Sequence, residues 1–501
     1  MSDRFVVAFD VGTSGVKAVL ADLGGHPVAS RYEPYGLRAL DGGRVEQDVE
    51  EIYGRLGAAC RALLEHPGVS AGQVEAVSVT AQMFNVVPVG PGGEPLMPML
   101  SWLDTRAAPQ AAALAEVMGP GEQFRRLGAI ITAKDILPRI LWLKEQAPEV
   151  WARTSKLLDC KEAVVALLCG ALVTDHAGAS AYRLADLDAG GWDAGACQAV
   201  GVPHSLLPEV AAATDLAGSV TGAAAAATGL LAGTPVVVGA GDVPASQVGA
   251  GAIGHGDAHV SLGTAVYFGI TLDRPAADPG RQLGVLGHMD PKRYILWLEI
   301  ATGGGALAWL LRLLGEAGAA PDYGEVDRLV AERLDDEGSL LFAPWLSGER
   351  VPVFDDRARA AFVGLDLSHD RGHLLRALME GVAYQMRWAL EYAAAFGEPI
   401  GELRAVGGGG IGSAWTQVIA DVLERPLGCV RAPQDAAARG AAACALVGIG
   451  VEPDLDFARR TAEVERTVQP VPARFGRHRR QYADFQALYA ALAPLYHRTG
   501  R

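Results

Sequence analysis

The chain has 501 residues, of which 50% are hydrophobic and 20% charged, and its net charge at pH 7 is −15. This length exceeds what one hydrophobic core supports and predicts two large domains of a soluble globular protein. The acidic balance argues against nucleic acid and anionic membranes as partners, because both require a basic surface, although a local basic pocket for a nucleotide is compatible with it.

The six cysteines form no CxxC pair and lie mostly in apolar, helix-like stretches, which favours buried reduced thiols over disulfides. No targeting segment is visible, because a buried-strand pattern that contains Asp10 begins within a few residues of the N-terminus. The longest apolar run, residues 163–173, is shorter than the roughly 20 residues that a membrane helix needs. We therefore expect a cytoplasmic protein with no membrane partner.

Residues 8–22, AFDVGTSGVKAVLAD, predict two strands joined by a tight turn, because apolar residues alternate up to Asp10 and again from Val16. The glycines at both ends of the turn let the backbone approach a ligand, and Thr13 and Ser14 add donors, so the turn is typical of a phosphate-binding nest. Asp10 beside it is suited to bind Mg²⁺ directly or through water. The alternative is an ordinary glycine-rich hairpin with a solvent-facing carboxylate.

Residues 254–270 repeat this scheme, with an alternating strand, a Gly263-Thr264 turn and a second strand. Two such hairpins suggest a duplicated architecture with one phosphate-holding turn in each half. A nucleotide could then be held between two lobes.

Asp48 is expected to cap a helix over residues 49–65. Residues 74–89 follow as a strand with a polar break at Gln82-Met83-Phe84, the place where open α/β sheets put ligand contacts.

The stretch from Ser101 to Arg106 brings Trp102, Asp104 and a guanidinium within a few residues. Aromatic faces with nearby charged groups suit a sugar, but the same grouping also occurs at plain domain edges. Residues 134–172 are predicted to be helical, with the apolar run around Ile140 in the core.

Residues 236–238 are an apolar run typical of a central buried strand, and Gly239-Ala240-Gly241 then leads to Asp242. A carboxylate at the tip of such a strand is held rigidly in a cleft and suits a general base. The alternative is that Asp242 caps the helix that begins near Pro244.

The second half contains glycine-rich entries to helices at residues 303–315 and 406–427, a helix over 373–395 and a closing helix over 475–497. A single glycine cluster is weak evidence. Three glycine-rich turns at strand ends along the chain together favour a nucleotide site, because a helix N-terminus after such a turn attracts negative charge.

The order of these pieces resembles the FGGY family of carbohydrate kinases over nearly the whole chain. The most specific match is AAFVGLDLSHDRGHLLRALME from Ala360 to Glu380, and LSGERVPVFDDRARAAFVGL is especially similar to xylulokinases. The resemblance implies an α/β, two-domain, duplicated fold of the actin-like, ribonuclease H-like type with an interdomain cleft. The expected domains are residues 1–250 for sugar binding, 251–445 for nucleotide binding and 446–501 as a helical tail packing back on the body.

By that resemblance Asp242 is the catalytic base, Asp10 lies by Mg²⁺, and the ATP contacts are Thr13, Ser14, Gly263, Thr264, Gly304, Gly410 and Ala414. The expected substrate contacts are Gln82, Met83, Phe84, Trp102, Asp104 and Asp242 itself. Dimers occur among similar proteins, which leaves a homodimer as an expectation for the assembly.

The chain departs from the family pattern at two places. Arg139 and Ile136 stand where the first family signature expects a Lys and a small residue. Xylulokinases carry Met-His after the Gln, whereas this chain keeps Met83 and then has Phe84, a phenyl ring that cannot hydrogen-bond a sugar. That change puts the identity of the sugar in doubt, because a site built to bond a hydroxyl discriminates strongly when the bond is lost.

The expected reaction is phosphorylation of a ketopentose such as D-xylulose to D-xylulose 5-phosphate by Mg-ATP. One alternative is an FGGY kinase for another sugar or polyol, of the ribulose, gluconate or glycerol and erythritol type. Another is an actin-like ATPase, which leaves Asp242, Gln82 and Trp102 without a role. A third is a sugar sensor without catalysis, which the retention of Asp10 and Asp242 argues against.

Overall fold

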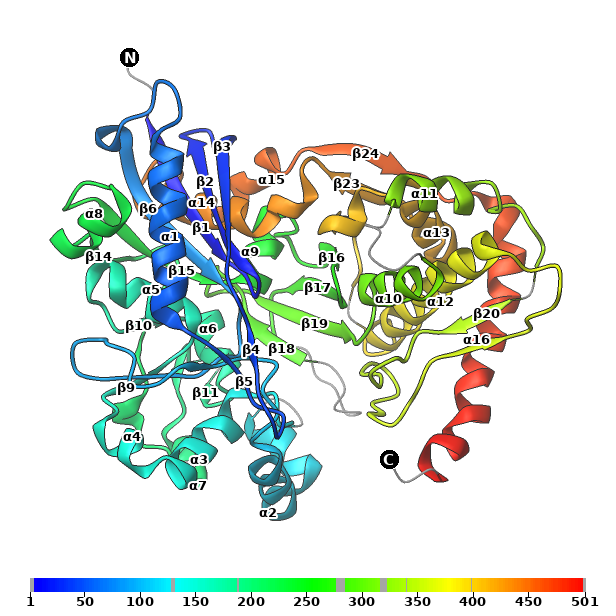
Figure 1. The fold of residues 1–501 in the computed structure, drawn as a ribbon, viewed down its shortest axis with the longest axis horizontal. Helices are drawn as coiled ribbons and strands as arrows, with labels where there is room; N and C mark the ends of the chain where they lie inside the picture. The colour runs from blue at the N-terminus through cyan, green and yellow to red at the C-terminus, as the bar shows by residue number, and fades with distance from the viewer. Residues whose placement is uncertain are drawn as a thin grey trace.

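The computed structural model describes residues 4–127, 131–186, 189–275, 284–315, 322–338, 340–397 and 399–498, which form two lobes side by side (Figure 1). The first lobe is built on a six-stranded sheet of order β14-β15-β6-β1-β2-β3. Its strands are β1 (Phe5–Val11), β2 (Gly15–Asp22), β3 (Pro27–Pro34), β6 (Val74–Ala81), β14 (Leu216–Ser219) and β15 (Pro235–Gly241).

The second lobe is built on a seven-stranded sheet of order β18-β19-β17-β16-β22-β23-β24. Its strands are β16 (Ala258–Leu262), β17 (Val266–Leu272), β18 (Gly284–Gly287), β19 (Tyr294–Ile300), β22 (Leu403–Val406), β23 (Leu427–Val430) and β24 (Val464–Val468).

The two sheets repeat one topology, which confirms the predicted duplication. In the first, β1 pairs antiparallel with β2 and parallel with β6, and β6 pairs parallel with β15. In the second, β16 pairs antiparallel with β17 and parallel with β22, and β22 pairs parallel with β23. Each sheet ends in one antiparallel strand on that side, β14 or β24. The two predicted hairpins are therefore equivalent elements of the two lobes.

Helices and short strands surround the first sheet. The helices are α1 (Val49–Leu64), α2 (Ala108–Leu127), α3 (Ile136–Gln146), α4 (Pro148–Arg153), α5 (Cys160–Cys169), α6 (His176–Ala181), α7 (Ala194–Val200), α8 (Gly222–Thr228) and α9 (Asp242–Gly249). The short strands are β4 (Arg38–Ala39), β5 (Val45–Gln47), β7 (Val87–Val89), β8 (Met99–Leu100), β9 (Lys156–Leu158), β10 (Val173–Asp175), β11 (Ala185–Asp186), β12 (Gly191–Trp192) and β13 (Glu209–Ala211). Asp48 caps α1 as predicted, since its side chain accepts from the amides of Glu50 and Glu51.

The prediction that residues 134–172 are helical is wrong over β9, which pairs with β7. Leu157 and Leu158 are adjacent and both fully buried, but they belong to two different hydrophobic clusters. Successive side chains point to opposite sides only in an extended strand, so packing on both sides decides the conformation there.

The second lobe carries α10 (Gly304–Leu314), α11 (Tyr323–Ala331), α12 (Arg371–Ala394), α13 (Ser413–Leu423), α14 (Ala436–Gly448), α15 (Ala458–Thr461) and α16 (Pro472–Arg498), with a hairpin of β20 (Leu341–Ala343) and β21 (Ala361–Val363). Residues 446–501 form more than a helical tail, because they also contribute β24 to the sheet. The domain boundaries themselves stay a prediction.

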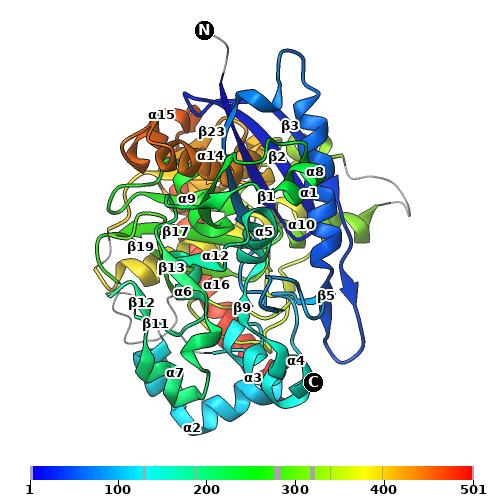
Figure 2. The same ribbon diagram turned by 90° about the vertical axis from the view of Figure 1, so that its left-hand side faces the viewer.

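Helices α9 and α14 cross between the lobes. α9 follows the first sheet but bonds the second, since Gln247 Nε2 donates to Thr271 Oγ1 at 2.8 Å. α14 follows the second sheet but packs on β1, β6 and β15 of the first (Figure 2). Glycines allow this crossing, because a Cβ on Gly249 would lie 1.7 Å from Ala436 O and one on Gly440 would lie 2.0 Å from Ala245 O. The two helices therefore connect the lobes.

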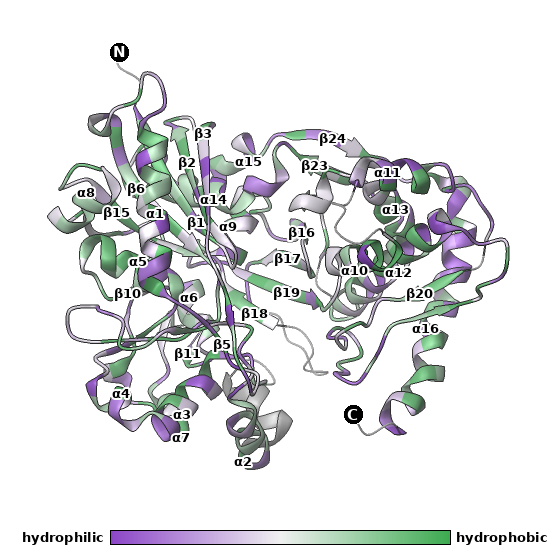
Figure 3. Ribbon diagram, in the orientation of Figure 1, coloured by the Kyte–Doolittle hydropathy of each residue, from purple (hydrophilic) through white to green (hydrophobic). Residues whose placement is uncertain are grey.

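The hydrophobic core lies on both faces of each sheet. Along β1, Val7 and Phe9 face one cluster, and Val6 and Ala8 face another that includes the small side chains of α14. Interior strands of both sheets are accordingly mostly apolar, as Figure 3 shows for β2 and β19.

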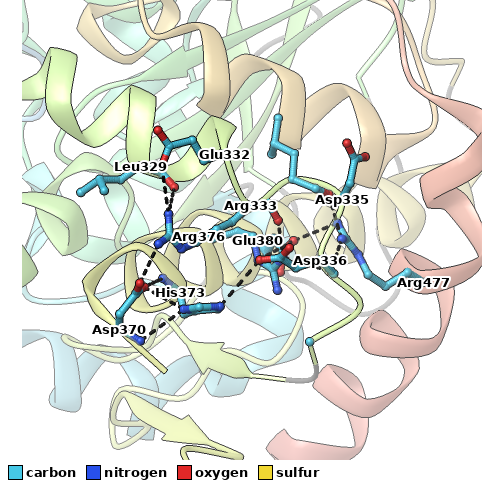
Figure 4. Close-up of polar contacts among 12 residues, drawn as sticks. Leu329, Glu332, Arg333, Asp335, Asp336, Asp370, His373, Arg376, Glu380 and Arg477 are labelled. Carbon is cyan, nitrogen blue, oxygen red and sulfur yellow. Dashed lines mark hydrogen bonds and ion pairs between the residues drawn. The ribbon is translucent and has the colours of Figure 1, made fainter. Parts of the chain in front are cut away.

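The closing helix α16 is held by buried charges as well as by its apolar face. Arg477 Nη2 lies 3.2 Å from Glu380 Oε1 on α12, and Arg376 Nε lies 3.7 Å from the same oxygen. Arg477 Nη1 also donates to the carbonyls of Leu334 and Asp336 at 2.8 and 2.6 Å (Figure 4). All three ionic side chains are nearly inaccessible to solvent, so α16 is part of the second lobe's core.

Within the described ranges no helix is both long and apolar enough to cross a bilayer. All six cysteines are free, and five of them are buried.

Candidate active site

A cavity of about 360 Å³ lies where the two lobes meet. Eight residues predicted from the sequence line it: five from loops and strand ends of the first lobe, Asp242 at the start of α9, and two from the turn of the second lobe. They are Thr13, Gln82, Met83, Phe84, Trp102, Asp242, Gly263 and Thr264. Six other predicted residues do not line it: Asp10, Ser14, Asp104, Gly304, Gly410 and Ala414.

The first glycine turn is held rigidly from behind. Gly12 N donates to Gly15 O at 3.0 Å, which closes the turn, and Gln47 Nε2 donates to Thr13 O at 2.8 Å. Only glycine fits at position 15, because a Cβ there would lie 2.7 Å from Glu33 O. Ser14 is exposed at the tip, and its carbonyl accepts from Tyr35 N at 3.1 Å.

Polar side chains from three loops meet above this turn. Trp102 Nε1 donates to Thr13 Oγ1 at 3.0 Å, and Gln82 Nε2 donates to Gln47 Oε1 at 2.8 Å. Thr13 Oγ1 in turn donates to Gln82 Oε1 at 3.3 Å. The network fixes the rotamers of the cavity wall in the first lobe.

The second glycine turn is tied to the start of α10. Gly304 N donates to Gly263 O at 2.8 Å, and Gly303 N and Gly305 N donate to Thr264 O at 3.0 and 2.9 Å. A Cβ on Gly304 would lie 2.6 Å from Gly263 O, so this residue must be glycine for the turn to keep its position. Gly304 therefore shapes the turn from outside the cavity.

Asp242 occupies the first position of α9 directly after β15, and the N-cap is Gly241. The helix-cap alternative for Asp242 is thus not what the structure shows, and the carboxylate borders the cavity instead. Burial and, to a smaller extent, the nearby Asp10 raise the pKa of Asp242 to about 7, against the opposing effect of the backbone amides of Val243 and Asp242. A carboxylate with a pKa near neutrality can hold and release a proton under physiological conditions.

Asp10 lies on β1 opposite Lys17 of β2, and it is close enough to Asp242 to affect the charge of that carboxylate. Burial raises its pKa to about 6, and Lys17 only partly offsets this, because the ammonium is engaged by Asp435 at 2.6 Å. Two partly buried carboxylates, of which Asp10 disfavours the charge of Asp242, are a donor set that a divalent cation would stabilise. The residues present therefore fit Mg²⁺ bound through Asp10, and no cluster of three or more metal-binding side chains occurs in the described part of the chain.

The structure corrects the prediction that Asp104 contacts the sugar. Its side chain is fully buried away from the cavity, where it accepts from Val45 N at 2.6 Å and from Arg106 N and Nε at 2.9 and 2.8 Å. Arg106 Nη2 continues to Glu46 Oε1 at 2.7 Å. Asp104 is saturated by this structural ion pair and has no oxygen left for a ligand.

The four-glycine stretch lies at the start of α13, as the sequence predicts for a strand, turn and helix. The helix N-terminus is already satisfied by a carboxylate, because Ala414 N and Ser413 N donate to Asp327 at 2.8 and 3.0 Å. Gly410 is buried behind this turn, where a Cβ would only touch Pro433 and Ala405. Their nucleotide contacts stay a prediction.

Sequence reasoning missed several charged and aromatic residues of the cavity wall: Lys134, Asp135, Arg183, Tyr267, Trp297, Glu299, Arg350 and Phe354. Arg350 and Phe354 lie within the quoted stretch LSGERVPVF, which was a usable signal. Arg183 and Trp297 carry no motif, and only folding brings them to the cavity.

Arg139, noted from the sequence only as a departure, turns out to hold the cavity loops together. It is fully buried, and its Nε donates to Asp135 O at 3.1 Å and its Nη1 to Leu100 O at 3.3 Å. Its guanidinium also bonds the carbonyls of Ser101, Phe84 and Lys134. Burial lowers its pKa to about 10. One planar side chain thus anchors three loops, which a Lys ammonium could do only in part.

Comparison with known proteins gives matches over most of the chain. The N-terminal domain of the FGGY family of carbohydrate kinases matches residues 5–249, and its C-terminal domain matches residues 258–449. Xylulose kinase of Escherichia coli K12 is 27% identical over 98% of this chain and 99% of its own length. Gluconokinase of Bacillus subtilis is 26% identical over 84% of this chain and 83% of its own. The crystal structure of xylulose kinase from Rhodospirillum rubrum covers 99% of this chain and 100% of its own, with a TM-score of 0.89 and 29% identity.

Proposed function

The chain belongs to the FGGY family of carbohydrate kinases and is an ATP-dependent sugar kinase, and from that premise we propose that it phosphorylates a ketopentose such as D-xylulose to D-xylulose 5-phosphate with Asp242 as general base. The observation that supports this role for Asp242 is its position in the structure. Asp242 directly follows strand β15 and lines the interlobe cavity together with the glycine turn of the second lobe and Thr13 of the first.

In the proposed reaction the substrate hydroxyl attacks the γ-phosphorus of ATP, and its proton passes to the Asp242 carboxylate while ADP leaves. The glycine turns at residues 12–15 and 263–264 supply backbone donors for the phosphates. Gln82, Met83, Phe84 and Trp102 form the wall against which the sugar is oriented. When bound, Mg²⁺ supplies charge neutralisation for the phosphates, and Asp10 is the residue that would hold it.

Two observations support D-xylulose within the family. The stretch that most resembles xylulokinases places Arg350, Val351 and Phe354 on the cavity wall, and xylulose kinases are among the relatives that span nearly the whole chain. Phe84 argues against assigning D-xylulose from the xylulokinases directly, because a phenyl ring cannot form the hydrogen bond to a sugar hydroxyl that a histidine forms. This favours a second candidate in the same class, a kinase of another sugar, sugar acid or polyol, with gluconokinase among the relatives.

The test is release of ADP measured over D-xylulose, D-ribulose, D-gluconate, glycerol and erythritol. We expect turnover that requires the sugar, is highest with D-xylulose, and falls by roughly 10³-fold or more in Asp242→Ala. Asp484→Ala, an exposed carboxylate on α16, is the matched control and should keep wild-type rates. Activity of Asp242→Ala equal to wild type would refute the assigned base, and preference for another panel member would replace D-xylulose.

A further inference from the structure

Phe84, Arg183 and Trp297 meet at one corner of the cavity, although they come from three distant parts of the chain. The ring of Phe84 stacks on Trp297 of β19, with centroids 5.7 Å apart and planes 18° from parallel. The guanidinium of Arg183 lies 6.0 Å from the centroid of the same phenyl ring. Because Phe84 belongs to the first lobe and Trp297 to the second, the corner closes the cavity across the lobe boundary.

Two hydrogen-bond donors at this corner have no partner among the described residues. They are Nε of Arg183, a residue only 6% exposed, and Nε1 of Trp297, and both atoms are buried. Each residue also lines the cavity. Buried donors without acceptors are costly, and a ligand oxygen that binds beside them would supply the missing acceptor.

The charge of Arg183 is only loosely balanced. The nearest carboxylate oxygen, Asp135 Oδ1, lies 3.9 Å from its Nε, while the other oxygen of Asp135 accepts from Thr132 N and Oγ1 at 2.8 and 2.9 Å. Arg183 Nη1 donates to Val285 O at 3.1 Å, which fixes the guanidinium beside the strand pair that carries Trp297.

The backbone is strained at the same place. Phe84 has a φ of 64° and Arg183 a φ of 62°, both in the left-handed region that large side chains rarely occupy. Such strain persists only where the surrounding structure enforces it, and it concentrates at ligand sites. Here it aims a phenyl ring and a guanidinium at one another.

We propose that Arg183 and Trp297 form a specificity site for an sp² oxygen of an open-chain substrate, either the ketone of a ketose or the carboxylate of a sugar acid. The inference rests on the proposed function and deepens it. Phe84 packs against the carbon chain, and the two donors beside it bind the planar oxygen group, which leaves the hydroxylated end for Asp242. A polyol, which has only hydroxyls at that end, offers a weaker acceptor and leaves the donors poorly satisfied.

The experiment compares each sp² substrate with its reduced partner, D-xylulose with xylitol and D-gluconate with D-glucitol, by kcat/KM and by calorimetric binding. We expect wild type to favour at least one sp² member by roughly 100-fold or more, and the pair that shows this identifies the ketone or the carboxylate. Trp297→Phe keeps the stack on Phe84 and removes only the N–H, and it should lower the preference by about tenfold. Arg183→Met should lower it by roughly 10- to 100-fold, with little change for the polyol.

Three outcomes bear on the proposal separately from the proposed function. Equal use of ketose, sugar acid and polyol by wild type would overturn it, as would a preference unchanged in both variants. If wild type turns over none of the four compounds, the proposed substrate is wrong. Calorimetric binding of the same compounds then tests the site formed by Arg183 and Trp297. Tighter binding of an sp² member that weakens in Trp297→Phe supports the site, and equal or absent binding refutes it. Thermal midpoints of the variants separate loss of fold from loss of selectivity.

Discussion

Burial shifts two carboxyl groups on the same side of the cleft toward neutrality. The pKa of Asp10 rises to about 6 and that of Asp242 to about 7, and the charge of Asp10 contributes to the rise of Asp242. A folded protein without ligand thus keeps protons on groups that an unfolded chain, with a pKa of 3.8, would have lost. The negative charge of these carboxylates is therefore unfavourable in the free protein, and a bound cation would stabilise it.

The activity should therefore depend on the ionisation of Asp242. Since only the carboxylate accepts a proton, kcat/KM for the sugar should rise about tenfold per pH unit below the pKa and level off above it. A bound cation favours the charged form, so the midpoint should lie at or below about 7. Initial rates between roughly pH 5 and 9, at fixed ionic strength, measure this, and a flat profile would contradict it.

Asp242→Asn should stabilise the fold while removing activity. Between pH 3.8 and about 7 the folded state binds the proton more tightly than the unfolded state, so the free energy of unfolding falls as pH rises. Above about 7 the full cost of the buried charge is present, and the neutral amide avoids it. Thermal unfolding should show a higher midpoint for Asp242→Asn at pH 8, and the difference should vanish near pH 4. A lower midpoint at pH 8 would count against the raised pKa.

At the scale of elements, the two glycine turns are equivalent in position, but different residues hold them in place. The first is held by side chains, chiefly Gln47 and Tyr35, and the second by the glycine run at the start of α10. In both, residues that do not line the cavity donate to the carbonyls of the turn. The turns are thus kept in position by elements that do not themselves touch the site.

Gly304→Ala should weaken nucleotide binding more than sugar binding. The new Cβ would lie 2.6 Å from Gly263 O, so the turn of the second lobe must shift. We expect KM for ATP to rise about tenfold, equivalent to about 1.4 kcal/mol, with KM for the sugar nearly unchanged. Gly222→Ala on α8, where a Cβ meets open space, is the control. A Gly304→Ala enzyme with wild-type KM for ATP would show that the turn does not depend on this contact.

Glu380→Gln should destabilise the contact between α12 and α16. It leaves Arg376 and Arg477 without their shared carboxylate in the protein interior, and breaking such a buried pair costs about 3–5 kcal/mol. Glu391→Gln makes the same change on α12, where the carboxylate is 49% exposed, and should cost about 1 kcal/mol or less. Denaturant titration measures both, and equal losses would contradict a special role for the buried triad.

At the scale of the whole molecule, the two lobes are joined by exchanged helices. α14 follows the second sheet and packs on the first, whereas α9 packs beside β6 and β15 of the first sheet and also contacts β17 of the second. The two helices touch through glycines at their crossing. The cavity lies beside this junction, since Asp242 is the first residue of α9. A small rotation at the crossing would change the width of the cavity without breaking either sheet.

The lobes should close when both substrates bind, because water in the cleft would otherwise be phosphorylated in place of the sugar. X-ray scattering with D-xylulose and a non-hydrolysable ATP analogue should give a smaller radius of gyration than the free protein. Either ligand alone should give a partial change or none. Identical scattering curves in all states would argue against closure.

The parts predicted well from the sequence are those controlled by neighbouring residues. The hairpin at residues 8–22, its repeat at 254–270, the cap at Asp48 and the strand that ends at Asp242 depend on alternation and turn chemistry within about ten residues. The family signature over 360–380 then extended this to the family and the duplicated fold. The prediction was wrong at β9, where burial on two sides overrides helix-like composition.

The sequence by itself therefore determined the duplicated glycine turns and the strand-end carboxylate, because short-range patterns encode both, and its resemblance to a known family indicated the class of chemistry. Only the tertiary structure decided that both oxygens of Asp104 are occupied by its ion pair with Arg106 and by backbone amides, that Arg139 anchors three loops, and that Arg183 and Trp297 both contact Phe84. Those facts depend on contacts between segments far apart in the chain, and no local pattern records which buried donor finds an acceptor.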